Sequence, residues 1–163
     1  MAKNKEEKTN VMRVLEQKKI AYTAHTYPHE EGMAVDGVTV AKSMGFDPAI
    51  VFKTLVARGA SKQYYVFDVP VAENLDLKKA AKAVGEKSIE MIHQKELLPL
   101  TGYVHGGCSP VGMKKLFPTV IDASAENLET MIVSAGKVGY QVELAPHDLA
   151  ALVRAKFADI IVE

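Results

Sequence analysis

Residues 51–69 read VFKTLVARGASKQYYVFDV and contain two runs rich in β-branched and aromatic residues, 51–56 and 64–69. Such runs favour β-strands, and the connection Arg58-Gly-Ala-Ser-Lys62 between them is a little longer than a tight turn. We therefore expect an antiparallel pair of strands, the second of which is closed by Pro70.

Outside this pair, hairpins alternate with helices along the chain. The clearest helix has its apolar stripe between Leu77 and Val84, with Asn74 or Asp76 as its N-cap and Gly85 at its end. Residues 29–37 lack a period and are expected to form an exposed loop. Further helices are expected at 5–19, 39–44 and 147–156, and further strands at 20–23, 88–91, 119–122, 129–134, 140–144 and 159–162.

The chain has 163 residues, 48% of them hydrophobic, which is enough to bury one core. We expect a single α+β domain over residues 1–163. Its sheet is predicted to be mixed, mostly antiparallel and barrel-like, surrounded by helices, because hairpins predominate over strand–helix–strand units.

Composition narrows the possible functions. The chain contains no apolar run of transmembrane length and no hydrophobic segment near its N-terminus, so we expect a cytoplasmic protein without a membrane partner. Cys108 is the single cysteine, which fits a reducing compartment. Twenty basic and twenty acidic residues argue against strong unaided binding to nucleic acid. A nucleic-acid substrate would need a local basic patch or a partner protein.

The stretch GYVHGGCSPVGMKK at 102–115 predicts a loop against which a ligand docks. Its glycines permit positive φ and close approach to the backbone, and Pro110 fixes one φ. Consecutive amides in such a loop can bind an oxyanion or a carbonyl oxygen. The spacing matches neither a P-loop nor a dinucleotide fingerprint, so no cofactor is expected. A loop shaped only for folding remains an alternative.

Three other features invite a chemical interpretation. Lys53 lies among apolar neighbours, either with its stem on the sheet and its head in water, or as a fixed positive charge for a carbonyl, carboxylate or phosphate. Cys108 is either a nucleophile with one of five histidines as base or a small buried hydrophobe. The turn at 134–139 has a plain hairpin connection as its simpler interpretation. No metal-ligand spacing is present.

In combination, these motifs resemble the YbaK family of aminoacyl-tRNA deacylases, which is related to the editing domain inserted in bacterial prolyl-tRNA synthetases. The resemblance runs over nearly the whole chain and is strongest to the branch that hydrolyses Cys-tRNA(Pro). The motifs that carry it are His25-Thr-Tyr27, Val51-Phe-Lys-Thr-Leu55, Leu77-Lys-Lys-Ala-Ala-Lys82, Gly106-Gly-Cys-Ser-Pro-Val-Gly-Met-Lys-Lys115 and Ser134-Ala-Gly-Lys137.

The resemblance implies a trans-editing hydrolase that removes cysteine from mischarged tRNA(Pro), with prolyl-tRNA synthetase as a partner. It implies that Lys53 is the essential lysine, and that Gly106 and Pro110 belong to a Gly-x-x-x-Pro loop next to the aminoacyl ester. Other residues would line the pocket and bind the substrate. These are Tyr27, Thr54, Gly107 and Ser134.

The implied mechanism uses no protein nucleophile, because the substrate's own thiol attacks its ester carbonyl. Amides near Gly106 would stabilise the oxyanion, while Lys53 would orient the terminal adenosine or its phosphate. Ala135 and Val138 stand where relatives often have Gly and Arg, so a tRNA contact made by that arginine is in doubt. Two alternatives remain: a non-catalytic module that binds the tRNA acceptor end or the synthetase, and a Cys108-dependent hydrolase of small esters or thioesters.

Overall fold

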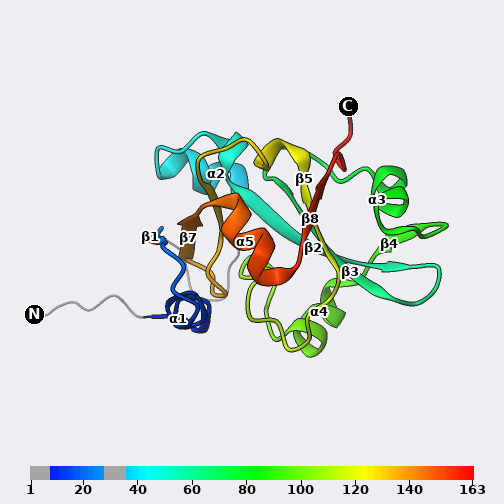
Figure 1. Cartoon of the computed structure of the whole chain (residues 1–163), viewed down its shortest axis with the longest axis horizontal. Helices are drawn as coiled ribbons and strands as arrows, with labels where there is room; N and C mark the ends of the chain where they lie inside the picture. Colours follow the sequence, from blue (N-terminus) through cyan, green and yellow to red (C-terminus); the bar gives the residue numbers. More distant parts are fainter. Residues whose placement is uncertain (1–7, 28–35) are drawn as a thin grey trace, which may run out of the picture.

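The computed structural model describes residues 8–27 and 36–163, which form an α+β unit of helices around two open sheets (Figure 1). The expected α+β class with mixed, mostly antiparallel pairing is confirmed, but the strands do not close into a barrel. The helices are α1 (Asn10–Gln17), α2 (Gly37–Ser43), α3 (Leu77–Val84), α4 (Gln94–Thr101) and α5 (Pro146–Val153), with short 3-10 turns at Pro48–Ile50 and Ala123–Ala125. The strands are β1 (Thr23–Thr26), β2 (Phe52–Gly59), β3 (Tyr64–Pro70), β4 (Ile89–Met91), β5 (Thr119–Asp122), β6 (Met131–Ser134), β7 (Tyr140–Leu144) and β8 (Lys156–Ala158).

The five-stranded sheet has the order β4-β2-β3-β5-β8. Its centre is the predicted hairpin, in which β2 and β3 run antiparallel and Thr54 lies opposite Asp68. β5 adds to β3 in parallel, and β8 adds to β5 in parallel. β4 pairs only with Ala57–Gly59, so in the described structure the first half of β2 has no strand on its β4 side.

The second sheet has the order β1-β7-β6 and is antiparallel throughout. β6 and β7 form the predicted hairpin, whose turn contains Gly136 and Gly139 at φ of +93° and +95°. A single parallel bridge between Val51 and Ile132 joins this sheet to the beginning of β2. The two sheets therefore meet at the Phe52 end of β2, where this strand has no neighbouring strand on its β4 side.

Helix ends follow the expected capping chemistry. The Asp76 side chain accepts hydrogen bonds from the amides of Lys78 and Lys79 at the start of α3, and Gly85 ends it at φ +75°. α2 begins two residues earlier than predicted because Asp36 caps it. α1 is shorter than predicted, and residues 5–7 of that prediction lie outside the described residues.

Several boundaries differ from the sequence predictions. β1 begins at Thr23, at the end of the strand predicted at 20–23. α5 ends at Val153, and β8 precedes the strand predicted at 159–162 because Arg154 adopts a left-handed conformation that ends the helix. The loop predicted at 29–37 lies outside the described residues up to position 35, and α2 begins at Gly37.

The main core packs α1, α5 and the three-stranded sheet against one face of β2 and β3. A second cluster packs α3 against the opposite face, where Ala57, Phe67 and Val69 lie. Side chains of β2 thus alternate between the two clusters, which decides the direction of each functional side chain. No helix in the described part of the chain is long and apolar enough to cross a membrane.

Candidate active site

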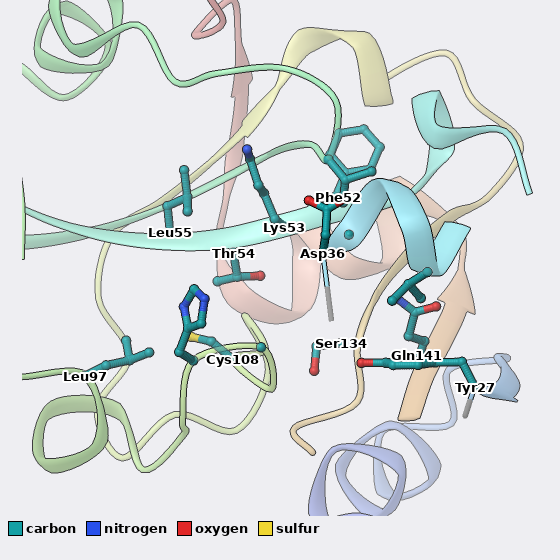
Figure 2. A pocket seen from close by; sticks show the side chains of 15 residues that line it. Tyr27, Asp36, Phe52, Lys53, Thr54, Leu55, Leu97, Cys108, Ser134 and Gln141 are labelled. Atoms are coloured by element: carbon teal, nitrogen blue, oxygen red, sulfur yellow. The ribbon is translucent and has the colours of Figure 1, made fainter. Parts of the chain in front are cut away.

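Five of the seven predicted site residues line one cavity of about 300 Å³. The cavity lies where the open edge of β2 faces the loop 102–115 and the adjoining ends of β6 and β7 (Figure 2). The five residues are Tyr27, Lys53, Thr54, Gly106 and Ser134.

The loop 102–115 forms one wall and is held by internal contacts. The buried Tyr103 hydroxyl donates a hydrogen bond to the Val111 carbonyl. Gly106 has φ +87°, a conformation that favours glycine, and it lines the cavity. Gly107 and Pro110 do not line the cavity but are buried. Gly107 and Pro110 therefore support the cavity wall without facing the cavity.

The turn at 136–139 touches this loop directly. A Cβ atom on Gly107 would lie 3.1 Å from the Val138 backbone nitrogen and 3.3 Å from the Lys137 Cα atom. The small size of residue 107 therefore sets the separation between the loop and the end of the β6–β7 hairpin, from which Ser134 reaches the cavity.

Lys53 and Thr54 point to opposite faces of β2, as neighbouring residues on a strand do. Figure 2 shows Thr54 on the side of Cys108 and Ser134, whereas Lys53 and Leu55 point to the other side. Lys53 borders the cavity beside α2, while Thr54 lies on the side of the glycine-rich loop.

The Lys53 ammonium is partly withdrawn from water. This burial lowers the pKa of Lys53, and the charges of Asp36 and Glu73 act in the opposite direction. Lys53 forms no ion pair with the residues that the structure describes. A desolvated cation near an open cavity is suited to bind an anionic group of a ligand.

Cys108 lines the cavity but is poorly suited to act as a nucleophile. Burial, and secondarily the nearby Asp68, raises the pKa of its thiol to about 12. No histidine in the described part of the chain hydrogen-bonds it: His25 pairs with Glu143 and His147 with the Glu126 carbonyl. The thiol therefore stays protonated near neutral pH, and no described histidine accepts its proton through a hydrogen bond.

Other lining residues were not singled out from the sequence. Gln141 lies opposite Ser134 in the β6–β7 pair, is 8% exposed, and has a side-chain oxygen with no hydrogen-bond partner in the described structure. No local sequence signal marks it, because Gln141 shares a face with Ser134 only through the register of the β6–β7 pair. The remaining additions include Asp36, Val40 and Leu97, while His105, one of the five histidines considered as a base for Cys108, also lines the cavity.

Residues 8–27 and 36–163 contain no group of three or more His, Cys, Asp or Glu residues that could hold a metal ion. Besides hydroxyls, amides and Lys53, the polar groups at the cavity include the Asp36 carboxyl group, the His105 imidazole and the Cys108 thiol. These groups bind and orient an ester or a carbonyl compound by hydrogen bonding.

A model of the aminoacyl-tRNA editing domain matches residues 29–152. The chain belongs to this editing-domain family. An Enterococcus faecalis (strain ATCC 700802 / V583) protein, provisionally named Cys-tRNA(Pro)/Cys-tRNA(Cys) deacylase EbsC, is 45% identical over 98% of both chains. A proline–tRNA ligase of Shouchella clausii (strain KSM-K16) is 28% identical over 100 residues, which make up 61% of this chain and 17% of the ligase.

Solved structures share the editing-domain fold. A crystal structure described as a candidate trans-editing enzyme for prolyl-tRNA synthetase superimposes with a TM-score of 0.78, covering 94% of this chain and 95% of the other. Its sequence identity is 24%, so this likeness concerns the fold alone.

Proposed function

We propose that this editing domain, formed by residues 1–163 as one unit, deacylates mischarged Cys-tRNA(Pro) in trans. The observation that carries the proposal is the 45% identity, over 98% of both chains, to a protein provisionally named as a Cys-tRNA(Pro)/Cys-tRNA(Cys) deacylase. The cavity supports it because the described residues that line it offer hydroxyl and amide groups, and their one thiol is not activated.

The substrate then supplies the nucleophile. The cysteinyl thiol loses its proton and its sulfur attacks the ester carbonyl carbon, so that a C–S bond forms and the ester C–O bond to the ribose breaks. The tRNA leaves with its hydroxyl restored, and the product is a small cyclic thioester. Holding both reacting groups of one substrate in one cavity supplies the proximity that this step needs.

Each predicted site residue takes a role that fits its position. The backbone amide of Gly106 stabilises the developing oxyanion, whereas the Gly107 amide already donates to the Val104 carbonyl. Lys53, on the other face of β2, binds the terminal adenosine or its phosphate at the border of the cavity. Tyr27, Thr54 and Ser134 line the cavity and bind the substrate, whereas Gly107 and Pro110 hold the loop in shape.

Selection of the tRNA is assigned to prolyl-tRNA synthetase, with both proteins in the cytoplasm. The chain carries twenty basic and twenty acidic residues, so electrostatic attraction to tRNA is weak. A synthetase that already holds the tRNA would supply the missing affinity.

A deacylation panel tests the function. Release of the amino acid from Cys-, Ala-, Ser- and Pro-tRNA(Pro) is followed at equal concentration, and Cys-tRNA(Pro) is expected to be cleaved fastest. Ser-tRNA(Pro) is the sharpest control, because its side chain differs by one atom and lacks the thiol. Protection of every ester from spontaneous hydrolysis would instead identify a non-catalytic binding module.

A further inference from the structure

Asp68 is a buried acid next to the cavity that the proposed mechanism does not yet use. It lies on β3, opposite Thr54 of β2, and is 0% exposed. The Thr54 hydroxyl donates a hydrogen bond of 2.6 Å to the Asp68 Oδ1 atom. Asp68 does not line the cavity itself and reaches it through Thr54, which does.

The second oxygen of this carboxyl group is left without a partner. Asp68 Oδ2 accepts no hydrogen bond from the residues that the structure describes. Asp122, equally buried at 2% exposure, shows the contrast: its two oxygens accept hydrogen bonds from the Ile160 and Ser124 amides. A half-satisfied buried carboxyl group costs stability, and an apolar residue of similar size would cost less. Fold stability therefore does not explain why an aspartate occupies position 68.

The surroundings of Asp68 make its carboxyl group a weak acid. Burial raises the pKa of Asp68 to about 7, and the hydrogen bond from Thr54 lowers it only partly. Among the described residues, the titratable group whose charge is coupled to Asp68 is the Cys108 thiol, which stays protonated. Near neutral pH the carboxyl group thus exchanges its proton readily, as an acid–base group does.

We propose that Asp68 is a positioning residue that acts through Thr54, holding the Thr54 hydroxyl so that its oxygen accepts the proton of the substrate's attacking thiol. This inference rests on the proposed function. Because the hydroxyl hydrogen is committed to Asp68 Oδ1, the lone pairs of the Thr54 oxygen remain for a donor in the cavity.

The proton balance of the step is complete within the substrate and these two residues. Thr54 Oγ1 receives the thiol proton while it gives its own hydrogen to Asp68 Oδ1, and the resulting thiolate attacks the ester carbonyl carbon. As the ester C–O bond breaks, Thr54 Oγ1 gives a proton to the ribose oxygen and takes its own hydrogen back from Asp68 Oδ1. Asp68 returns to its ionised form, and no further reactant is consumed.

The test compares kcat of the wild type with that of Asp68→Asn across pH 6 to 8, on Cys-tRNA(Pro). The asparagine retains an oxygen that accepts the Thr54 hydrogen but takes up no proton. We expect the ratio of the two kcat values to rise with pH as Asp68 ionises, to about tenfold or more at pH 8, while KM changes little. Using the ratio cancels the ionisation of the substrate thiol.

Three further variants complete the experiment. Thr54→Val removes the hydroxyl at nearly constant volume and should reproduce the pH-dependent ratio, so it also decides the question if Asp68→Asn does not fold. In the double variant the two losses should be far from additive, because both interrupt one path. Asp122→Asn is the matched control and should give a ratio that does not vary with pH.

The outcomes distinguish a failure of the proposed deacylase function from a failure of the proposed role of Asp68. A wild type that leaves Cys-tRNA(Pro) intact overturns the proposed function. An active wild type with a ratio independent of pH, or with fully additive losses, overturns the role of Asp68 and leaves the deacylase function standing.

Discussion

At the scale of single residues, Lys53 shows how strand alternation divides the site. Its ammonium lies on the face of β2 opposite Thr54, where burial lowers its pKa. Burying this ammonium costs desolvation free energy, and no ion pair in the described structure offsets the cost. A ligand that binds Lys53 would explain why a lysine is found there. We predict that Lys53→Ala lowers kcat/KM for Cys-tRNA(Pro) by about a hundredfold or more, with the melting temperature unchanged or raised.

The control for this prediction is Lys82→Ala, which removes an exposed lysine of α3 that does not line the cavity. It changes the net charge by the same amount and should leave kcat/KM within about twofold. Full activity of folded Lys53→Ala would remove Lys53 from the site.

The sequence leaves open whether Cys108 is a nucleophile, and the structure argues against that role. With a pKa raised to about 12, roughly one thiol in 10⁵ is ionised at pH 7. We predict that Cys108→Ala keeps kcat/KM within about threefold, and that iodoacetamide labels the native protein far more slowly than the unfolded chain. An inactive but folded Cys108→Ala variant would favour the cysteine hydrolase instead.

Asp68 should also give the fold a specific dependence on pH. Its pKa is about 7 in the folded state and near 3.8 in the unfolded chain, so between these values the folded state binds the extra proton. The free energy of unfolding therefore falls as pH rises from about 4 to about 7 and is level above. Between pH 5 and pH 8 the loss is about 2–3 kcal/mol.

Urea unfolding of the wild type and Asp68→Asn at both pH values measures this loss. Glu16, Glu86 and Glu143 have pKa values below their ordinary value, so they titrate outside the window, and the difference between the two proteins isolates Asp68. An equal pH dependence in both proteins would show that Asp68 is ionised throughout.

Which site residues can be predicted from the sequence depends on how locally they are determined. Gly106 lies within a glycine-rich motif, and Lys53 is a charge in an apolar run. Asp68 and Gln141 matter only because of what stands opposite them, Thr54 and Ser134. Cross-strand register depends on pairing over the whole sheet, so the sequence alone did not identify these two residues.

At the scale of elements, local chemistry explains both successes and failures. The β2–β3 hairpin and α3 carry strong signals, since propensity, caps and turn residues agree. α4 was missed because Pro99 lies inside it and proline disfavours a helix interior. The helix nevertheless forms and ends at Gly102, where the loop 102–115 begins.

The contact between that loop and the turn at 136–139 carries the element-scale prediction. Gly107→Ala places a methyl group 3.1 Å from the Val138 nitrogen, which forces two walls of the cavity apart. We predict a loss in kcat/KM of about tenfold, together with about 1–3 kcal/mol of stability.

Asp76→Ala separates the two effects. It removes the N-cap of α3 and should cost about 1 kcal/mol of unfolding free energy, with kcat/KM unchanged because α3 lies away from the cavity. If activity falls equally in both variants when each is measured well below its melting temperature, Gly107 does not position the cavity wall.

At the scale of the whole molecule, the sequence predicts the fold class but not the division into two sheets. β5 and β8 join the central hairpin in parallel across long separations, and a single bridge at Val51 links the sheets. No local sequence pattern predicts such pairings, because both the entropy lost in bringing distant strands together and the free energy gained by pairing them depend on long-range contacts. The open edge of β2, and with it the cavity, arises from this division.

The balance of charge over the whole chain leads to the last prediction. With twenty basic and twenty acidic residues, the isolated protein neutralises few phosphates. We expect it to bind tRNA(Pro) with a Kd on the order of 10⁻⁵ M or weaker at about 0.15 M salt, with little preference among tRNAs. Fluorescence anisotropy with labelled tRNA(Pro) measures this affinity, and deacylation assays with and without prolyl-tRNA synthetase measure its consequence. The synthetase should lower the KM for Cys-tRNA(Pro) without raising kcat, because it supplies binding and not chemistry. Submicromolar, tRNA(Pro)-selective binding by the isolated chain would show instead that a local surface, hidden by the overall balance of charge, reads the tRNA directly.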